Sequence, residues 1–131
     1  MNQPGDKEMN EKLKDWVKQQ LDATVKDFME QGVVKGLLVE AKPAWAFPFQ
    51  ILIGKVRERE QGDEFSWFIC GDLPTDRLDS AQAASPREAA RHFALKWQLE
   101  AERREPLDEE LVRKAESLYE LANEDSLWVT G

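Results

Sequence analysis

Residues 65–76 read Phe-Ser-Trp-Phe-Ile-Cys-Gly-Asp-Leu-Pro-Thr-Asp, and this stretch decides the fold. Its first half, residues 65–70, is dense in aromatic and β-favouring side chains, which predicts a strand. Successive side chains of a strand point to opposite faces of the sheet, and both alternating sets contain apolar groups here. We therefore expect a strand inside the sheet, covered at least partly on both faces. The second half, residues 71–76, contains a glycine, a proline and two carboxylates and is typical of a stiff polar turn.

This strand is the second half of a predicted hairpin. Residues 49–59 contain the apolar run Ile-Leu-Ile and predict the first strand, whose charged outer end is expected to project into solvent. Residues 60–63, Glu-Gln-Gly-Asp, predict the turn, and residues 64–70 predict the return strand.

The segment before the hairpin is rich in aromatic residues and proline. Residues 37–41 predict a short strand, and the prolines of Pro-Ala-Trp-Ala-Phe-Pro at 43–48 exclude a helix there. Trp45 and Phe47 either cap the open end of the core or line a groove. The burial preference of large aromatic side chains favours the core.

Residues 10–31 predict a long N-terminal helix. Its apolar residues recur at spacings of three and four, so they lie on one face of the helix. They are Leu13, Val17, Leu21, Thr24, Val25 and Phe28, with Trp16 at the margin. Gly32 is a typical stop, because glycine readily takes the left-handed conformation after the last helical turn. Residues 1–8 contain proline, glycine and polar groups, and we expect them to be disordered.

After the turn, residues 73–84 show neither a helical nor a strand period and predict an irregular connection. Ser-Pro-Arg-Glu at 85–88 is typical of a helix start, with serine as the N-cap and proline in the first position. This helix should continue to about residue 103. Because Leu95 and Leu99 lie on the side opposite its main apolar stripe, we expect packing on two sides and interpret it as the central helix.

Pro106 ends that helix, and a second helix is predicted to begin near residue 107 or 108. So short a connection makes the two helices antiparallel. Residues 127–129, Leu-Trp-Val, are expected to dock back on the core. The sequence thus predicts an α+β fold in one domain, 1–131, with an N-terminal helix, a small antiparallel sheet centred on the 49–70 hairpin, and a C-terminal antiparallel helix pair.

Composition and length are those of an ordinary globular protein. The chain has 131 residues, of which 41% are hydrophobic and 34% charged, which suits one domain with one core. The apolar runs are too short to span a bilayer, and the N-terminal residues lack the apolar stretch of a secretory signal, so we expect a cytoplasmic protein without a membrane part. Cys70 is the single cysteine and is interpreted as a buried, inert thiol.

The net charge of −8 argues against nucleic acid as a partner, because such binding relies on Lys and Arg side chains that neutralise phosphates. Two basic clusters, Arg87 with Arg91 and Arg103 with Arg104, are interspersed with carboxylates and are interpreted as salt-bridged helix faces. The partners that we expect are therefore another protein or a second copy of the chain. No cofactor is predicted.

The turn at 71–76 has the best functional claim. Gly71 allows a sharp departure from the strand, and Pro74 stiffens the loop. Asp72 and Asp76, with Thr75 beside them, are candidates to bind a cation, orient a basic group or accept a proton. The same residue types often cap backbone amides, so a structural role is the main alternative. Two carboxylates without a third ligand do not predict a metal site.

The helix after the turn carries two further polar candidates, Arg91 and His92. His92 follows Glu88 by four residues, which suits a hydrogen bond between them. If the turn folds over the start of this helix, Asp72 or Asp76 reaches Arg91 or His92. The alternative is a half-exposed histidine in a salt-bridge network. The sequence contains no catalytic-triad order, phosphate-binding loop, dinucleotide fingerprint or zinc spacing.

Several short motifs occur together along the chain. They are Gly-Asp-Leu-Pro-Thr-Asp at 71–76, Arg-His-Phe at 91–93, Trp-Gln-Leu at 97–99, and Ala-Glu-Ser-Leu-Tyr-Glu-Leu at 115–121 followed by Leu127-Trp128. With the N-terminal helix that carries Trp16, this combination resembles a family of short proteobacterial proteins classed as a domain of unknown function. The resemblance covers most of the chain. It implies a single domain in a bacterial cytoplasm and implies no activity, cofactor or catalytic residue.

Three functional hypotheses follow. The first is a small interaction or ligand-binding module, whose site comprises Asp72, Thr75, Asp76, Arg91, His92 and Trp45. The second is a small hydrolase or transferase that uses Asp72, Asp76 or His92 in acid–base chemistry, which requires these groups to converge within direct or one-water contact. The third is that the turn is structural and that the function lies in oligomer assembly.

Overall fold

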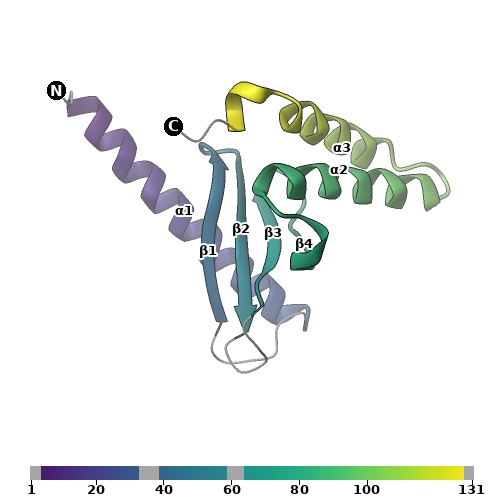
Figure 1. The fold of residues 1–131 in the computed structure, drawn as a ribbon, viewed down its shortest axis with the longest axis horizontal. Helices are drawn as coiled ribbons and strands as arrows, with labels where there is room; N and C mark the ends of the chain where they lie inside the picture. The colour runs from purple at the N-terminus through teal and green to yellow at the C-terminus, as the bar shows by residue number, and fades with distance from the viewer. Residues whose placement is uncertain (1–3, 33–38, 59–63, 129–131) are drawn as a thin grey trace.

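The structure, a computed structural model, describes residues 4–32, 39–58 and 64–128, in which the chain forms three α-helices and four strands. In chain order they are α1 (Pro4–Glu30), β1 (Val39–Phe47), β2 (Ile51–Glu58), β3 (Ser66–Gly71), β4 (Asp76–Leu78), α2 (Pro86–Arg103) and α3 (Glu109–Ala122), with short 3₁₀ turns at Ser80–Gln82 and Asp125–Trp128. The sheet lies between α1 and the α2–α3 pair (Figure 1). The predicted α+β fold is confirmed.

The sheet is antiparallel, with strand order β1-β2-β3-β4, so β3 is an interior strand. Trp67 and Ile69 pack in the core cluster shared with α2 and α3. Phe68 and Cys70 point the other way, into a second cluster shared with α1. The prediction that both faces of this strand are covered is therefore confirmed, and the sheet carries two separate apolar cores.

The first strand is longer than predicted. Instead of a strand at 37–41 followed by a separate aromatic segment at 43–48, β1 runs on to Phe47; Leu37 and Leu38 lie outside the described residues. Proline is tolerated here because β1 is an edge strand, where one row of N–H groups has no partner strand. A register shift between Pro43 and Trp45 absorbs the irregularity, as a bulge does.

The predicted irregular connection at 73–84 also contains a strand. β4 pairs with β3, with Ile69 opposite Asp76, so the polar turn connects two strands of the sheet. Three residues are too few to show a period, which is why the sequence pattern misses β4. Gly71 has a φ of +110°, and a Cβ there would lie 2.2 Å from the Gln50 carbonyl oxygen, so the expected sharp departure does require glycine.

The predicted helix ends are mostly confirmed. Gly32, with a φ of +74°, follows α1 as the expected stop, although α1 begins at Pro4 rather than at residue 10; residues 1–3 lie outside the described part. Ser85 caps α2 by accepting a hydrogen bond from the Glu88 N–H. The hairpin turn predicted at 60–63 falls on residues that the structure does not describe.

One prediction about α2 is wrong. Leu95 and Leu99 are 53% and 44% exposed, so that side of the helix is not packed. Its buried residues face the sheet and α3 and are Ala89, Ala90, Phe93, Ala94, Trp97 and Ala101. Four of these six are alanines, which allow α3 to approach closely. No element of the described chain covers the leucine side, because α3 lies against the alanine flank instead.

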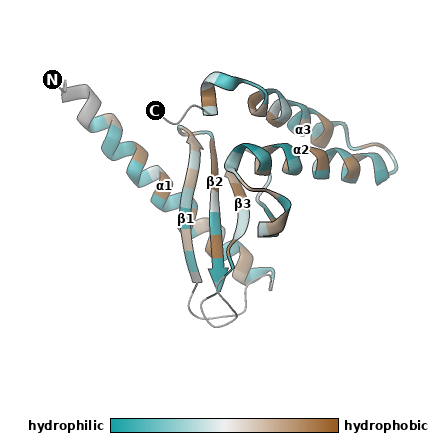
Figure 2. Ribbon diagram, viewed as in Figure 1, coloured by the Kyte–Doolittle hydropathy of each residue, from teal (hydrophilic) through white to brown (hydrophobic). Residues whose placement is uncertain are grey.

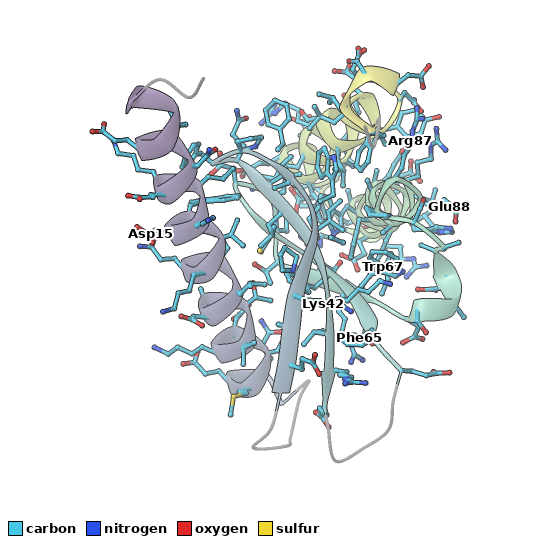
Figure 3. All side chains as sticks on the ribbon, turned by 60° about the vertical axis from the view of Figure 1, so that its left-hand side comes forward. Asp15, Lys42, Phe65, Trp67, Arg87 and Glu88 are labelled. Carbon is cyan, nitrogen blue, oxygen red and sulfur yellow. The ribbon has the colours of Figure 1, made fainter. Side chains whose placement is uncertain are left out.

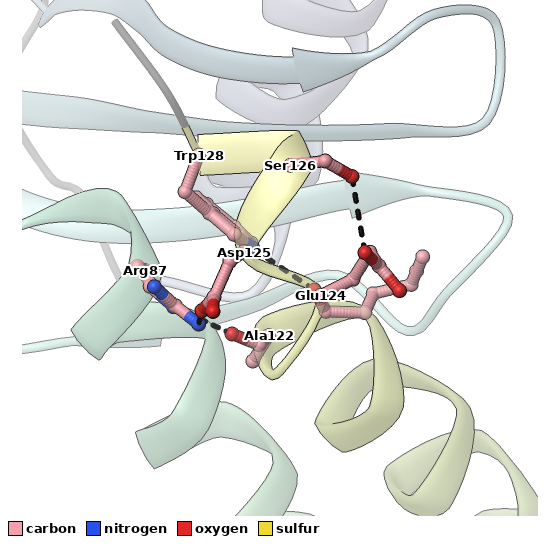
Figure 4. A network of polar contacts seen from close by, with 7 residues as sticks. Arg87, Ala122, Glu124, Asp125, Ser126 and Trp128 are labelled. Atoms are coloured by element: carbon pink, nitrogen blue, oxygen red, sulfur yellow. Dashed lines mark hydrogen bonds and ion pairs between the residues drawn. The ribbon is translucent and has the colours of Figure 1, made fainter.

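Leu127 and Trp128 dock on the core as predicted, and Val129 lies outside the described residues. Trp128 stacks on Trp45 with 4.0 Å between ring centroids and 16° between ring planes. The indole N–H of Trp45 donates to the Leu127 carbonyl at 2.9 Å, and Arg87 donates to the Ala122 carbonyl at 2.6 Å (Figure 4). These contacts tie α2, α3 and β1 together at one end of the molecule.

Candidate functional site

Asp76, the best candidate in the turn, is held on both carboxylate oxygens. Oδ1 accepts hydrogen bonds from Lys96 Nζ and from the Arg77 N–H, each at 2.8 Å, and Oδ2 accepts one from Trp97 Nε1 at 2.9 Å. The Asp76 side chain is 22% exposed. A carboxylate with these three partners fixes β4 to the middle of α2, and most of its acceptor sites are used within the fold.

The other two candidates in the turn, Asp72 and Thr75, are exposed to solvent. The Asp72 side chain is exposed, and its backbone N–H donates to the Gln50 carbonyl at 2.7 Å. Thr75, also exposed, lines a polar cavity of about 400 Å³ together with Asp76. The cavity is completed by Pro74 of the turn and by residues of α2, α3 and their connection, which are Trp97, Glu100, Arg104, Asp108, Glu110, Leu111 and Lys114. The turn therefore meets the α2–α3 corner.

Arg91 and His92 line a different hollow. It has a volume of about 240 Å³ and lies between α2 and α3, where Leu95, Gln98 and Tyr119 complete it. The predicted Glu88–His92 hydrogen bond does not form, since the Glu88 carboxylate accepts from the Ala84 N–H at 2.8 Å. Asp76 and His92 thus line separate cavities and do not converge as acid–base chemistry requires.

Trp45 lies away from both cavities. Its ring is partly buried, stacks on Trp128 and packs against the core cluster of α2 and α3. The structure therefore confirms the core interpretation of this residue over the groove interpretation.

Besides Asp76, the polar cavity is lined by two ion pairs and one further acid, Glu100. Arg104 pairs with Asp108, and Lys114 pairs with Glu110. Half-buried Glu100 has no hydrogen bond or ion pair with any residue of the described chain. In residues 4–32, 39–58 and 64–128, no group of three His, Cys, Asp or Glu side chains is placed to hold a metal ion.

Asp108 caps α3, and this role makes stability depend on pH. The Leu111 N–H donates to Asp108 Oδ1 at 3.1 Å and, with Arg104, holds the pKa of this carboxyl below its usual value. A pKa lowered by folding contributes stability that is complete above the unfolded value of about 3.9 and is lost as the pH falls through the folded value. We expect Tm to fall more steeply with acid in the wild type than in Asp108→Asn, which keeps a capping oxygen but does not titrate.

Thermal unfolding followed by circular dichroism between about pH 5 and pH 2.5 measures this difference. Asp79→Asn, which replaces an exposed aspartate that caps no helix by a side-chain hydrogen bond, is the matched control. Equal acid slopes for the wild type and Asp108→Asn would contradict the role of the cap.

A third hollow was not predicted. A groove of about 850 Å³ runs between α1 and β1, and its apolar wall is an i, i+4 row on α1 opposite Ala41 and Pro43 of β1. The row is Leu13, Val17, Leu21, Val25 and Met29. Brown apolar positions recur along the otherwise hydrophilic α1 in Figure 2. The sequence did indicate this groove. The row lies beside the buried residues Thr24 and Phe28, so the apolar face of α1 is wider than packing against the sheet requires.

Comparison with known proteins identifies a family match. A family model described as a domain of unknown function, DUF4826, matches residues 10–128, and it confirms the expectation that the chain belongs to a family of unknown function. No curated protein and no solved structure matches the chain. Within the described ranges, no helix is long and apolar enough to cross a membrane.

Proposed function

We propose that this chain, which belongs to the DUF4826 family, is a protein-interaction module that associates with a second copy of itself through the α1–β1 groove. The observation that supports this function is the apolar row on α1. It runs over 17 residues from Leu13 to Met29, or about 24 Å at a rise of 1.5 Å per residue, and each of its members is partly or largely exposed. Continuous apolar rows of this kind on a protein surface mark interaction sites.

The sheet leaves room for a second helix beside α1. Strands lie about 4.8 Å apart, so four of them make a layer wider than the roughly 10 Å diameter of one helix. α1 contacts β1 and β3, and its Phe28 shares a cluster with Leu52 and Phe68. Beside this contact, Ala41 and Pro43 of β1 form the groove wall. A helix of similar length would complete this layer.

A second copy of α1 suits the groove because the apolar row on α1 can pack against the same row of another copy. Ridges at i, i+4 spacing pack into one another at a crossing angle near −50°, and a two-fold dimer uses the same surface on both copies. The charged residues that line the groove are of both signs, the three lysines Lys14, Lys18 and Lys26 and the two acids Asp22 and Glu30, so each copy offers both charges to the other.

The expected dimer is reversible. One helix–helix crossing buries less than the roughly 1,600 Å² of a standard interface, so we expect a dissociation constant in the micromolar range, about 1–100 µM. Each copy has a net charge of −8, and the repulsion between two copies weakens the dimer further. Raising the salt concentration should therefore tighten the dimer, because salt screens this repulsion.

The double variant Leu13→Glu/Met29→Glu tests this function. Both residues line the groove, and neither belongs to the apolar cluster under α1, so the fold should be retained. Desolvating the added carboxylates should raise the dissociation constant more than about 100-fold, or roughly 2.7 kcal/mol. Sedimentation velocity from about 5 to 500 µM, analysed for the 15.1 kDa chain and its dimer, measures the change.

Leu95→Glu is the control, because Leu95 is 53% exposed on α2, outside the groove. It should dimerise like the wild type. A wild-type chain that stays monomeric across this concentration range would refute the proposal, and so would a double variant that dimerises normally.

A further inference from the structure

The sheet face turned away from α1 carries an unusual pair of like charges. In the β1–β2 register Lys42 lies directly opposite Lys55, and in the β2–β3 register Lys55 lies opposite Trp67. Like charges directly opposite each other on neighbouring strands destabilise a sheet. In Figure 3 the labelled Lys42, Phe65 and Trp67 lie on this side, away from α1.

Neither lysine is neutralised by a carboxylate in the part of the chain that the structure describes. Lys42 Nζ lies 4.5 Å from the centroid of the Phe65 ring, and Lys55 Nζ lies 4.9 Å from that of Trp67. Neither ammonium group forms an ion pair with a residue of the described chain. The nearby carboxylate of Glu40 is taken by Arg57, at 2.8 Å from its Nη2, and the Arg57 guanidinium also lies over the Phe65 ring at 4.6 Å. Among the residues that the structure describes, Lys42, Lys55 and Arg57 therefore share this face with the carboxylate of Glu40.

This arrangement contrasts with the rest of the molecule. The chain has a net charge of −8, yet this part of the sheet has an excess of positive charge on rigid, paired strands. The lysine face comprises Glu40, Lys42, Lys55, Arg57, Phe65 and Trp67. α2 and α3 lie towards the other end of the sheet, where β1 ends and β2 begins (Figure 1), and Lys42 is exposed.

We propose that the lysine face binds a short acidic segment of a partner protein, with neighbouring carboxylates of that segment engaging Lys42 and Lys55. An acidic segment supplies the counter-charge that the sheet lacks and removes the repulsion between the two lysines. Since the two residues are paired on adjacent strands, their ammonium groups are presented together without any rearrangement of the backbone. The face lies opposite the α1–β1 groove, so this binding does not depend on the proposed dimer.

A peptide fits this face better than nucleic acid does. Single-stranded nucleic acid stacks its bases on open aromatic rings, but Lys42 and Arg57 already lie over Phe65, and Trp67 is only 4% exposed. A polyphosphate backbone also extends beyond a small patch and would meet the negative charge of the remaining surface. A segment of a few residues meets only the positive charge.

The probe is a fluorescein-labelled octamer of glutamate, with fluorescence anisotropy measured at about 50 mM and 200 mM salt. The wild type should bind at the lower salt and bind more weakly at the higher one, because the Debye length shortens. Lys42→Ser/Lys55→Ser should weaken binding at least 10-fold. Lys12→Ser/Arg103→Ser, which removes the same charge from exposed sites on α1 and α2, should stay within about two-fold of the wild type.

A single variant separates binding from folding. Lys42→Glu places opposite charges across the β1–β2 pair, so its Tm should equal or exceed that of the wild type while peptide binding is lost.

Three results would overturn the proposal. They are the absence of wild-type binding at about 1 mM protein, an equal loss in the Lys12→Ser/Arg103→Ser control, and tighter binding of an eight-nucleotide single-stranded DNA than of the glutamate peptide. The last result would assign the face to nucleic acid instead.

Discussion

Replacing Phe68 by alanine is expected to lower the free energy of unfolding by about 3–5 kcal/mol, because the substitution leaves a cavity in a closely packed core. Phe68 is fully buried on β3, at the centre of the cluster that joins the sheet to α1. Its ring lies against the backbone of β2, where a Cβ on Gly54 would come within 2.6 Å of the ring. Few neighbours can move into the space that the ring leaves, since the opposite wall is the sheet itself.

Urea unfolding followed by tryptophan fluorescence measures this loss. Leu99→Ala is the control, since Leu99 is 44% exposed, and its effect should remain within about 0.5 kcal/mol. A loss below about 1 kcal/mol for Phe68→Ala would show that the core under α1 contributes little to stability. Gly54→Ala tests the same contact from the β2 side. It should also lower the free energy of unfolding, because the added Cβ would lie 2.4 Å from the Lys42 carbonyl oxygen.

Replacing Asp76 by alanine is expected to lower the free energy of unfolding by about 2–3 kcal/mol. The substitution removes the acceptor of the Trp97 indole N–H, and Trp97 is 1% exposed, so water cannot readily replace the carboxylate. It also removes the ion pair with Lys96, whose contribution is small because both side chains are partly exposed. Together these contacts attach β4 to α2.

Asp72→Ala is the matched control within the same turn. The Asp72 side chain is exposed, and we expect its loss to change stability by less than about 0.5 kcal/mol. Equal effects of the two substitutions in chemical unfolding would contradict a structural role specific to Asp76. The expected difference would assign the two aspartates of the turn to different roles, although the sequence pattern treats them alike.

Local sequence patterns predicted the elements that carry strong local signals. The Ser85-Pro86 helix start, the stop at Gly32 and the two-faced strand at Phe68 follow from capping, backbone and alternation rules that act within a few residues. β4 and the continuation of β1 through Pro43 were missed, because a three-residue strand has no period and an edge strand tolerates proline.

The candidate site was only partly predictable for a similar reason. The turn does fold onto α2, but it reaches Lys96 and Trp97 rather than Arg91 and His92. Which turn of the helix it meets depends on the pairing of β4 with β3, and that register is not visible in the sequence of either segment. The predicted residues are therefore divided between two cavities, the core and, for Asp72, the exposed surface of the turn.

The sequence by itself determined the α+β class, the three helices, the hairpin and the two-sided burial of its central strand, because these depend on the spacing of apolar, capping and turn residues along the chain. Only the tertiary structure decided which apolar side chains remain uncovered and which charges face each other. The α1 row faces a groove because one helix is narrower than four strands. Lys42 faces Lys55 because the strand register, set by contacts between distant residues, places them in one pair.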